Sequence, residues 1–324
     1  MLTADEILRL VNDHLAAMPY NRQPATLYEP IQYVLSMGGK RIRPTLMMLA
    51  YNIFKEQPAD ILGPACALET YHNYTLLHDD LMDHAPMRRG HQTVHERWNE
   101  NTAVLSGDTM LVLAYQRMAS CRQDKLKEVL DLFTETALEI GEGQQYDMEF
   151  EKRMDVSEDE YIEMIRLKTS VLLACALKIG AVLADASPED ADRLYAFGEK
   201  IGLAFQLQDD YLDVYGDPKV FGKAIGGDIL CNKKTYMLIN AMAKADEGQR
   251  RELTHWLTAE SYDPKEKIAA VTTLYNKIGI DKMAQAKIRY YFDESQRYLE
   301  AVGVPSERKQ ELLSYTRRMM NRSH

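Results

Sequence analysis

The stretch LYAFGEKIGLAFQLQDDYLD, residues 194–213, decides the fold of this chain. Its apolar residues recur every three or four positions, at Leu194, Phe197, Ile201, Ala204 and Phe205. This period is typical of one face of an α-helix, whereas a half-buried strand alternates every two residues. The stretch therefore predicts a long helix that carries three aspartates near its end.

The same helical period returns in residues 126–140 and 162–179, and we find no sustained alternation of a strand. With 17 Gly and 11 Pro in 324 residues, helix breakers are scarce. No internal repeat, low-complexity segment or flexible linker interrupts the pattern. We therefore predict an all-α protein of ten or more helices that forms a single domain over residues 1–324.

Composition limits the class of function. The chain has 39 Lys and Arg against 49 Asp and Glu, so a general nucleic-acid binder is not expected. Its apolar share of 46% is that of an ordinary globular protein. No apolar run is long enough to cross a membrane, the first residues lack a secretory signal, and four widely spaced cysteines form no framework. We therefore expect a cytoplasmic protein with no transmembrane segment.

Two acidic clusters share one spacing, Asp-Asp-x-x-Asp. The first occupies residues 79–83 and the second residues 209–213. On a helix, Asp79 and Asp83 share a face, where like charges repel unless a cation neutralises them. One such cluster alone is more often a solvated helix face, but its repetition after an uncharged stretch favours a site for divalent ions. Mg²⁺ prefers such oxygen ligands together with substrate phosphates.

Basic residues accompany both clusters and a glycine-containing turn. Arginine and lysine among carboxylates indicate metal-bridged phosphates rather than a calcium buffer. For any single lysine, above all Lys219 and Lys234, a local salt bridge is an equal alternative. The residues concerned are Arg88 and Arg89 after the first cluster, Lys219, Lys223, Lys233 and Lys234 after the second, and Lys40, Arg41 and Arg43 after Gly38 and Gly39.

The ordered set of motifs resembles that of the trans-isoprenyl diphosphate synthases, the polyprenyl synthetase family. A single Asp-Asp-x-x-Asp is a weak signal, whereas the whole set is specific. The matching motifs lie at residues 38–44, 79–83 with 88–90, 143–147, 168–169, 205–213 and 222–228.

The resemblance implies the isoprenoid synthase fold, a helical bundle around a central cavity, and a homodimer. It also implies a reaction in which an allylic diphosphate (dimethylallyl, geranyl or farnesyl) ionises and isopentenyl diphosphate attacks the cation. Proton loss then leaves a chain that is longer by five carbons. Three Mg²⁺ ions are expected with the bound diphosphate.

The resemblance also assigns roles to individual residues. Direct Mg²⁺ ligands are Asp79, Asp83 and Asp209, while Asp80, Asp210 and Asp213 bind through water or orient the others. The allylic diphosphate is held by Arg88, Lys168, Lys223 and Lys233, and isopentenyl diphosphate by Lys40, Arg43, His72 and Arg89. The oxygen dipoles of Thr169 and Gln206 lie near the developing cation. Arg322 either closes over isopentenyl diphosphate or belongs to a frayed tail.

The sequence leaves two product lengths open, fifteen and twenty carbons. By the resemblance, Tyr74 lines the floor of the product tunnel, and its bulk together with the absence of an insertion within residues 79–83 is typical of short-chain synthases. Two other functions compete. A terpene cyclase on the same fold would lack the second Asp-Asp-x-x-Asp, and an inactive regulatory subunit would usually lose one cluster.

Overall fold

The computed structural model describes residues 1–217 and 225–321. The chain divides into two units, each described here by itself. Unit 1 comprises residues 1–134, 175–194 and 303–312, and unit 2 comprises residues 135–174, 195–302 and 313–324. Along the chain, four of the five divisions fall within the helices α7 (Leu126–Glu151), α9 (Val171–Leu183), α10 (Pro188–Tyr215) and α17 (Ser306–Met320), and the fifth falls between Val302 and Gly303.

Unit 1 contains the N-terminal helices and a small hairpin. Its other elements are α1 (Ala4–Ala16), α2 (Ala25–Ser36), α3 (Ile42–Phe54), η1 (Pro58–Ile61), α4 (Leu62–Met82), β1 (Met87–Arg88), β2 (His91–Gln92), α5 (Val94–Arg97), α6 (Glu100–Met118) and η2 (Gln123–Lys125).

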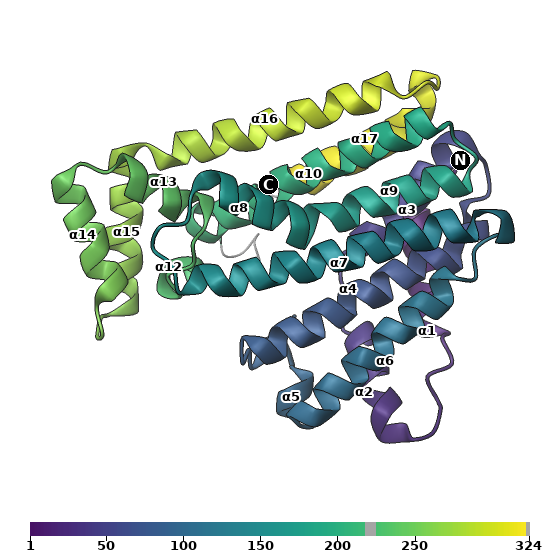
Figure 1. The fold of residues 1–324 in the computed structure, drawn as a ribbon, viewed down its shortest axis with the longest axis horizontal. Coiled ribbons are helices and arrows are strands. Elements are labelled where there is room, and N and C mark those ends of the chain that lie inside the picture. The colour runs from purple at the N-terminus through teal and green to yellow at the C-terminus, as the bar shows by residue number, and fades with distance from the viewer. Residues whose placement is uncertain (218–224, 322–324) are drawn as a thin grey trace. The chain divides into compact units, whose positions relative to one another are not determined.

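The core of unit 1 forms around α3 and α4. Nearly every side chain of α3 from Ile42 to Ile53 is buried, and α4 is buried along most of its first half. Helix α6 lies beside α4 over much of its length, and α2 contacts α6 in turn (Figure 1). Because α4 is held by these neighbours, its end is a fixed support for the first acidic cluster.

Unit 2 is also built from helices. Its other elements are α8 (Glu158–Ile165), the π-helical turn η3 (Arg166–Ser170), α12 (Gly227–Leu230), α13 (Tyr236–Lys244), α14 (Glu247–Thr258), α15 (Pro264–Ile278) and α16 (Ile280–Ala301). A core of buried residues from α8, α10, α13, α15 and α16 holds this unit together. Helices α14 and α15 lie side by side (Figure 1).

The prediction of an all-α protein with ten or more helices is confirmed. Among the described residues, the only strands are the two-residue β1 and β2, paired antiparallel. Pro44 lies in the first turn of α3, and α10 begins at Pro188 with the Ser187 hydroxyl accepting from the Asp190 N–H at 3.1 Å. Within the described ranges, no helix combines the length and apolar character needed to span a membrane.

Candidate active site

The first acidic cluster lies at the C-terminal end of α4. Asp79 and Asp80 belong to its last turn, and the Asp83 N–H donates to the Asp79 carbonyl at 2.9 Å to close the helix. The helix dipole makes this end negative, so three carboxylates here destabilise one another and the helix end. A cation bound at these carboxylates would remove that repulsion.

Arg88 neutralises part of this charge. Its Nε lies 2.7 Å from both carboxylate oxygens of Asp80, and its Nη2 lies 3.8 Å from Asp79. Burial raises the pKa of Asp80, and the hydrogen bond from Arg88 opposes that rise. Arg88 ends β1, and the turn that follows has positive φ at Arg89 and Gly90, as a tight hairpin requires. The hairpin thus sends two successive arginines back toward α4.

Arg89 lies against the glycine turn before α3. Its Nη1 donates to the Gly38 carbonyl, and a Cβ on Gly39 would come within 2.8 Å of that guanidinium. Gly39 also has φ of 132°, and this backbone conformation is what favours glycine here, because the Arg89 guanidinium is the end of a flexible side chain. The turn therefore brings Arg89 beside Lys40 and the start of α3, where backbone N–H groups favour an anion.

Arg41 of the same turn has a structural role. It is only 4% exposed, pairs with the buried Glu69 at 2.7 Å and donates to the Leu35 carbonyl at 2.7 Å. Its φ of 47° turns the side chain inward. Arg41 is therefore a structural residue of the turn and not a candidate phosphate ligand.

Two of the predicted isopentenyl diphosphate residues, Arg43 and Arg89, lie near His72 of α4. Burial and then the charges of Arg43, Arg89 and further arginines hold the pKa of His72 well below its usual range. The imidazole is therefore neutral at pH 7 and can donate one hydrogen bond without adding charge. Lys40, exposed at the turn, completes the set that the sequence predicted.

Tyr74 belongs to an aromatic cluster between the helices of unit 1. Its ring lies 5.4 Å from Tyr71 and 4.9 Å from His78, and Tyr71 in turn contacts Phe133 at 5.2 Å. Tyr115 of α6 meets Phe133 at 4.8 Å. Within this cluster, Tyr74 lies five residues before Asp79 on the same helix.

The second cluster lies on α10, and Asp210 is its most constrained member. It is 4% exposed, and its two oxygens accept from the Tyr161 hydroxyl and, at 3.0 Å, from Gln206 Nε2. Burial, followed by the charge of Asp228, raises the pKa of Asp210 to about 7, against the opposing effect of Lys233. With both oxygens engaged, Asp210 is suited to orient the cluster.

A chain of hydrogen bonds extends from Asp210 to the π-helical turn. Gln206 accepts from the Thr169 hydroxyl at 3.1 Å, and the neighbouring Lys168 Nζ donates to Asp147 at 2.6 Å. A Cβ on Gly143 of α7 would come within 2.4 Å of the Lys168 backbone nitrogen, so only glycine allows this approach. The predicted catalytic residues Lys168, Thr169 and Gln206 are therefore contiguous.

Asp147 is the last residue of the 143–147 motif, to which the resemblance assigned no role. Burial would raise its pKa, but the charges of Lys233 and Lys168 outweigh burial and lower it. Both lysines thus stabilise the ionised form of Asp147.

Asp213 organises the turn that follows α10. Its carboxylate accepts from the Asp228 N–H at 2.9 Å, and its carbonyl accepts from Gly226 at 2.6 Å. The Lys233 N–H then donates to the Asp228 carbonyl at 2.9 Å, which closes the turn of α12. Asp213 therefore supports the segment that carries Lys233.

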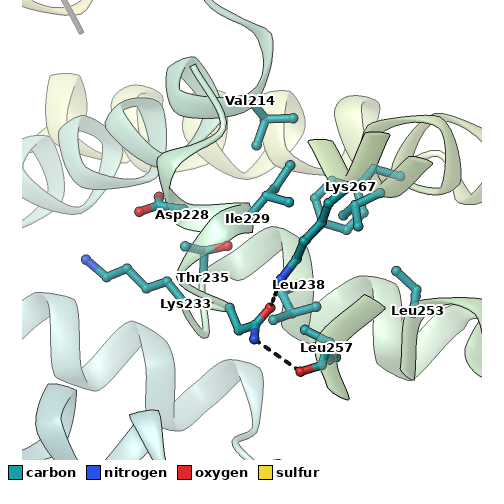
Figure 2. Close-up of a pocket in the computed structure, with 12 residues that line it drawn as sticks. Val214, Asp228, Ile229, Lys233, Thr235, Leu238, Leu253, Leu257 and Lys267 are labelled. Atoms are coloured by element: carbon teal, nitrogen blue, oxygen red, sulfur yellow. Dashed lines mark hydrogen bonds between the residues drawn. The ribbon is translucent and has the colours of Figure 1, made fainter. Parts of the chain in front are cut away.

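A buried lysine on α15 holds the residue that precedes Lys233. Lys267 of α15 is 1% exposed and donates to Asn232 Oδ1 at 2.7 Å, while Asn232 Nδ2 donates to the Leu257 carbonyl at 3.1 Å (Figure 2). Asn232 has φ of 53° and directly precedes Lys233. Nothing in the spacing of the sequence revealed this network.

Two predicted residues, Lys223 and Arg322, lie outside the described residues, as does Lys219. Lys234 donates to the main-chain carbonyl of Glu151 at 3.0 Å, which is a hydrogen bond and not the local salt bridge given as its alternative.

The carboxylates fit a divalent metal by their chemistry. Within residues 1–217 and 225–321, no three His, Cys, Asp or Glu side chains gather closely enough to hold an ion by themselves. Mg²⁺ commonly takes only one or two carboxylates and completes its shell with substrate phosphates and water. Asp79, Asp83 and Asp209 each carry carboxylate oxygen atoms of the hard type that Mg²⁺ prefers.

Known proteins are similar to this chain both in sequence and in fold. The chain is 37% identical over 289 residues to the short chain isoprenyl diphosphate synthase of Methanothermobacter thermautotrophicus, covering 87% of this chain and 89% of the relative. A crystal structure of a geranylgeranyl pyrophosphate synthase is 38% identical, with a TM-score of 0.94 and full coverage of both chains. A polyprenyl synthase from Caulobacter crescentus, crystallised with calcium and isoprenyl diphosphate, is 26% identical with a TM-score of 0.84, covering 98% of this chain and 93% of that one.

A sequence model of the polyprenyl synthetase family matches residues 24–275, a range that includes both acidic clusters and the glycine turn. The chain therefore belongs to the polyprenyl synthetase family of prenyltransferases, which confirms the family and the class of enzyme that its motifs predicted.

Proposed function

We propose that this enzyme condenses an allylic diphosphate with isopentenyl diphosphate and releases an all-trans prenyl diphosphate of fifteen or twenty carbons. The observation that carries the proposal is the pair of acidic clusters, each backed by its own cations. Arg88 lies at the first cluster, and Lys168 and Lys233 lie near the second. These cations suit the charge that develops on a departing diphosphate.

We assign Mg²⁺ to the direct ligands Asp79, Asp83 and Asp209, with three ions expected. When bound, the ions would neutralise the diphosphate and assist its departure. Asp80 and Asp210, whose oxygens already accept from Arg88, Tyr161 and Gln206, act by orienting these ligands. The complex of the Caulobacter crescentus relative with calcium and isoprenyl diphosphate supports a divalent ion beside the substrate.

We assign the second diphosphate to Lys40, Arg43, His72 and Arg89. This set contains no acid, so isopentenyl diphosphate would be held there by charge-assisted hydrogen bonds alone. Neutral His72 can donate to an oxygen atom of that diphosphate. The Thr169 hydroxyl and the Gln206 carbonyl present partial negative charge to the allylic cation, and the released diphosphate accepts the proton lost in the last step.

We assign the limit on chain length to Tyr74. Its position in an aromatic cluster of α4, α6 and α7 supports this assignment, because a packed ring blocks further growth of an apolar chain. The name of the structurally similar geranylgeranyl pyrophosphate synthase favours the twenty-carbon product.

We further propose a homodimer in the cytoplasm. Val104, Leu105 and Val112 of α6 are 44%, 59% and 67% exposed, and they lie on adjoining faces of one helix. Such apolar exposure on a long helix is suited to burial against a second copy.

The decisive experiment is incubation of the purified chain with dimethylallyl diphosphate, radiolabelled isopentenyl diphosphate and Mg²⁺. Chromatography of the dephosphorylated products should show label in a fifteen- or twenty-carbon alcohol. Asp79→Ala and Asp209→Ala should each reduce turnover by orders of magnitude without loss of helical content. Label that never enters a longer product would contradict the proposal.

A further inference from the structure

A large hollow in unit 2 lies on α10, α16 and the end of α17, and the proposed reaction does not use it. Its volume is about 810 Å³. The lining side chains come from Gln208, Tyr211, Leu212 and Tyr215 of α10, from Gln285, Ile288, Arg289 and Phe292 of α16, and from Arg317 and Met320 of α17, with Gly216, Asp217 and Asn321 beside them.

The hollow lies on a different face of α10 from the acidic cluster. At about 100° per residue, Tyr211 and Tyr215 are turned by about 160° and 120° from Asp209, whereas Asp213 is turned by only about 40°. A ligand in the hollow would therefore contact the helix that carries the second cluster without occupying the place of its carboxylates.

The floor of the hollow is apolar and ordered. The rings of Tyr211 and Tyr215 stack at 4.8 Å between centroids, and Gln285 Nε2 fixes the Tyr211 hydroxyl at 2.7 Å. Leu212 and Met320 are buried, while Ile288 and Phe292 are half-buried. Aromatic and aliphatic surface of this kind is suited to the chain of a lipid-like molecule.

The rim of the hollow carries positive charge. Arg289 and Arg317 are both exposed, and no carboxylate of the described residues pairs with either one. Asp217 is the only acid among the lining residues. Two guanidinium groups without acidic partners can donate several hydrogen bonds to one polyanionic head group.

We propose that this hollow is a second, non-catalytic binding site for a prenyl diphosphate of fifteen or twenty carbons, with the diphosphate on Arg289 and Arg317 and the isoprenoid chain over Tyr211, Tyr215 and Phe292. The choice of ligand rests on the proposed function, since that reaction makes this amphiphile. Bound there, the product contacts α10 and lowers turnover without competing for the active site.

The test measures binding separately from turnover. Geranylgeranyl diphosphate, below its micellar concentration, is titrated into the full chain in EDTA by calorimetry. Parallel titrations use inorganic diphosphate, geranylgeraniol and palmitate. The variants are Arg289→Gln with Arg317→Gln, which removes the charges, and Ile288→Trp, which fills the floor. Arg251→Gln with Lys265→Gln removes the same charge from the exposed α14 and α15.

We expect geranylgeranyl diphosphate to bind at least tenfold more weakly to the two hollow variants and unchanged to the control pair. Inhibition of turnover by added product should decrease in parallel. Equal binding to all variants would overturn the proposal, and so would inorganic diphosphate or palmitate binding as tightly as geranylgeranyl diphosphate. Arginine-dependent binding by a chain that shows no turnover would contradict the proposed function and leave this site standing.

Discussion

Replacement of Asp210 by asparagine should stabilise the metal-free protein at alkaline pH. The Asp210 carboxyl has a pKa of about 7 in the folded chain, because it is buried and faces Asp228, against an ordinary value of 3.8. Below pH 3.8 the group is protonated in both states and its ionisation costs nothing. As the pH rises to about 7, only the unfolded chain ionises, so stability is lost across this window.

The size of the effect follows from the two pKa values. Each pH unit between them costs about 1.4 kcal/mol, so the wild-type carboxyl costs about 4 kcal/mol above pH 7. The asparagine introduced by Asp210→Asn does not titrate, and its amide can still contact Tyr161 and Gln206. The stability of Asp210→Asn relative to wild type should therefore rise by about 4 kcal/mol between pH 4 and pH 8.

Urea unfolding in EDTA, followed by circular dichroism at several pH values, measures this difference. Asp293→Asn, which removes an exposed carboxyl of α16, is the matched control. A difference between Asp210→Asn and wild type that is the same at pH 4 and pH 8 would refute the reasoning.

Three further predictions concern other parts of the molecule. Lys267→Met keeps the packing of the side chain but releases Asn232, so we expect the KM for the allylic diphosphate to rise about tenfold, equivalent to about 1.4 kcal/mol, while kcat changes less; an unchanged KM would contradict a positioning role. Arg41→Met leaves Glu69 buried without its cation and should cost about 3–5 kcal/mol in urea unfolding, whereas an effect below about 1 kcal/mol would show that the pair does not matter. Tyr74→Ala should lengthen the product, as chromatography of the dephosphorylated alcohols would reveal, and an unchanged product would place the floor elsewhere.

The sequence was sufficient for the helices and for the residues that repeat within them. The period over residues 194–213 predicted α10, and the two acidic clusters could be recognised because their spacing is local. Lys168, Thr169 and Gln206 were assigned by resemblance; in the structure Thr169 donates to Gln206, while the adjacent Lys168 donates to Asp147.

Partners that come from distant parts of the chain could not be predicted. Tyr161 reaches Asp210 from α8, and Asp147 reaches Lys168 from α7, through packing that no spacing encodes. In the same way, Arg41 has the residue type of a phosphate ligand, and only its backbone conformation and its burial against Glu69 give it a structural role.

The π-helical turn η3 offsets the register between two helices. It holds one residue more than an α-helical turn and continues directly from α8 into α9. Deletion of a single residue there would rotate everything that follows by about 100° relative to α8. Most of α9 from Val171 to Leu183 is buried, so such a rotation would move nearly every one of its side chains out of the place into which it packs. The extra residue in the turn that carries Lys168 is therefore also needed for the packing of α9. A chain with a shortened turn would misfold and lose activity for that reason alone.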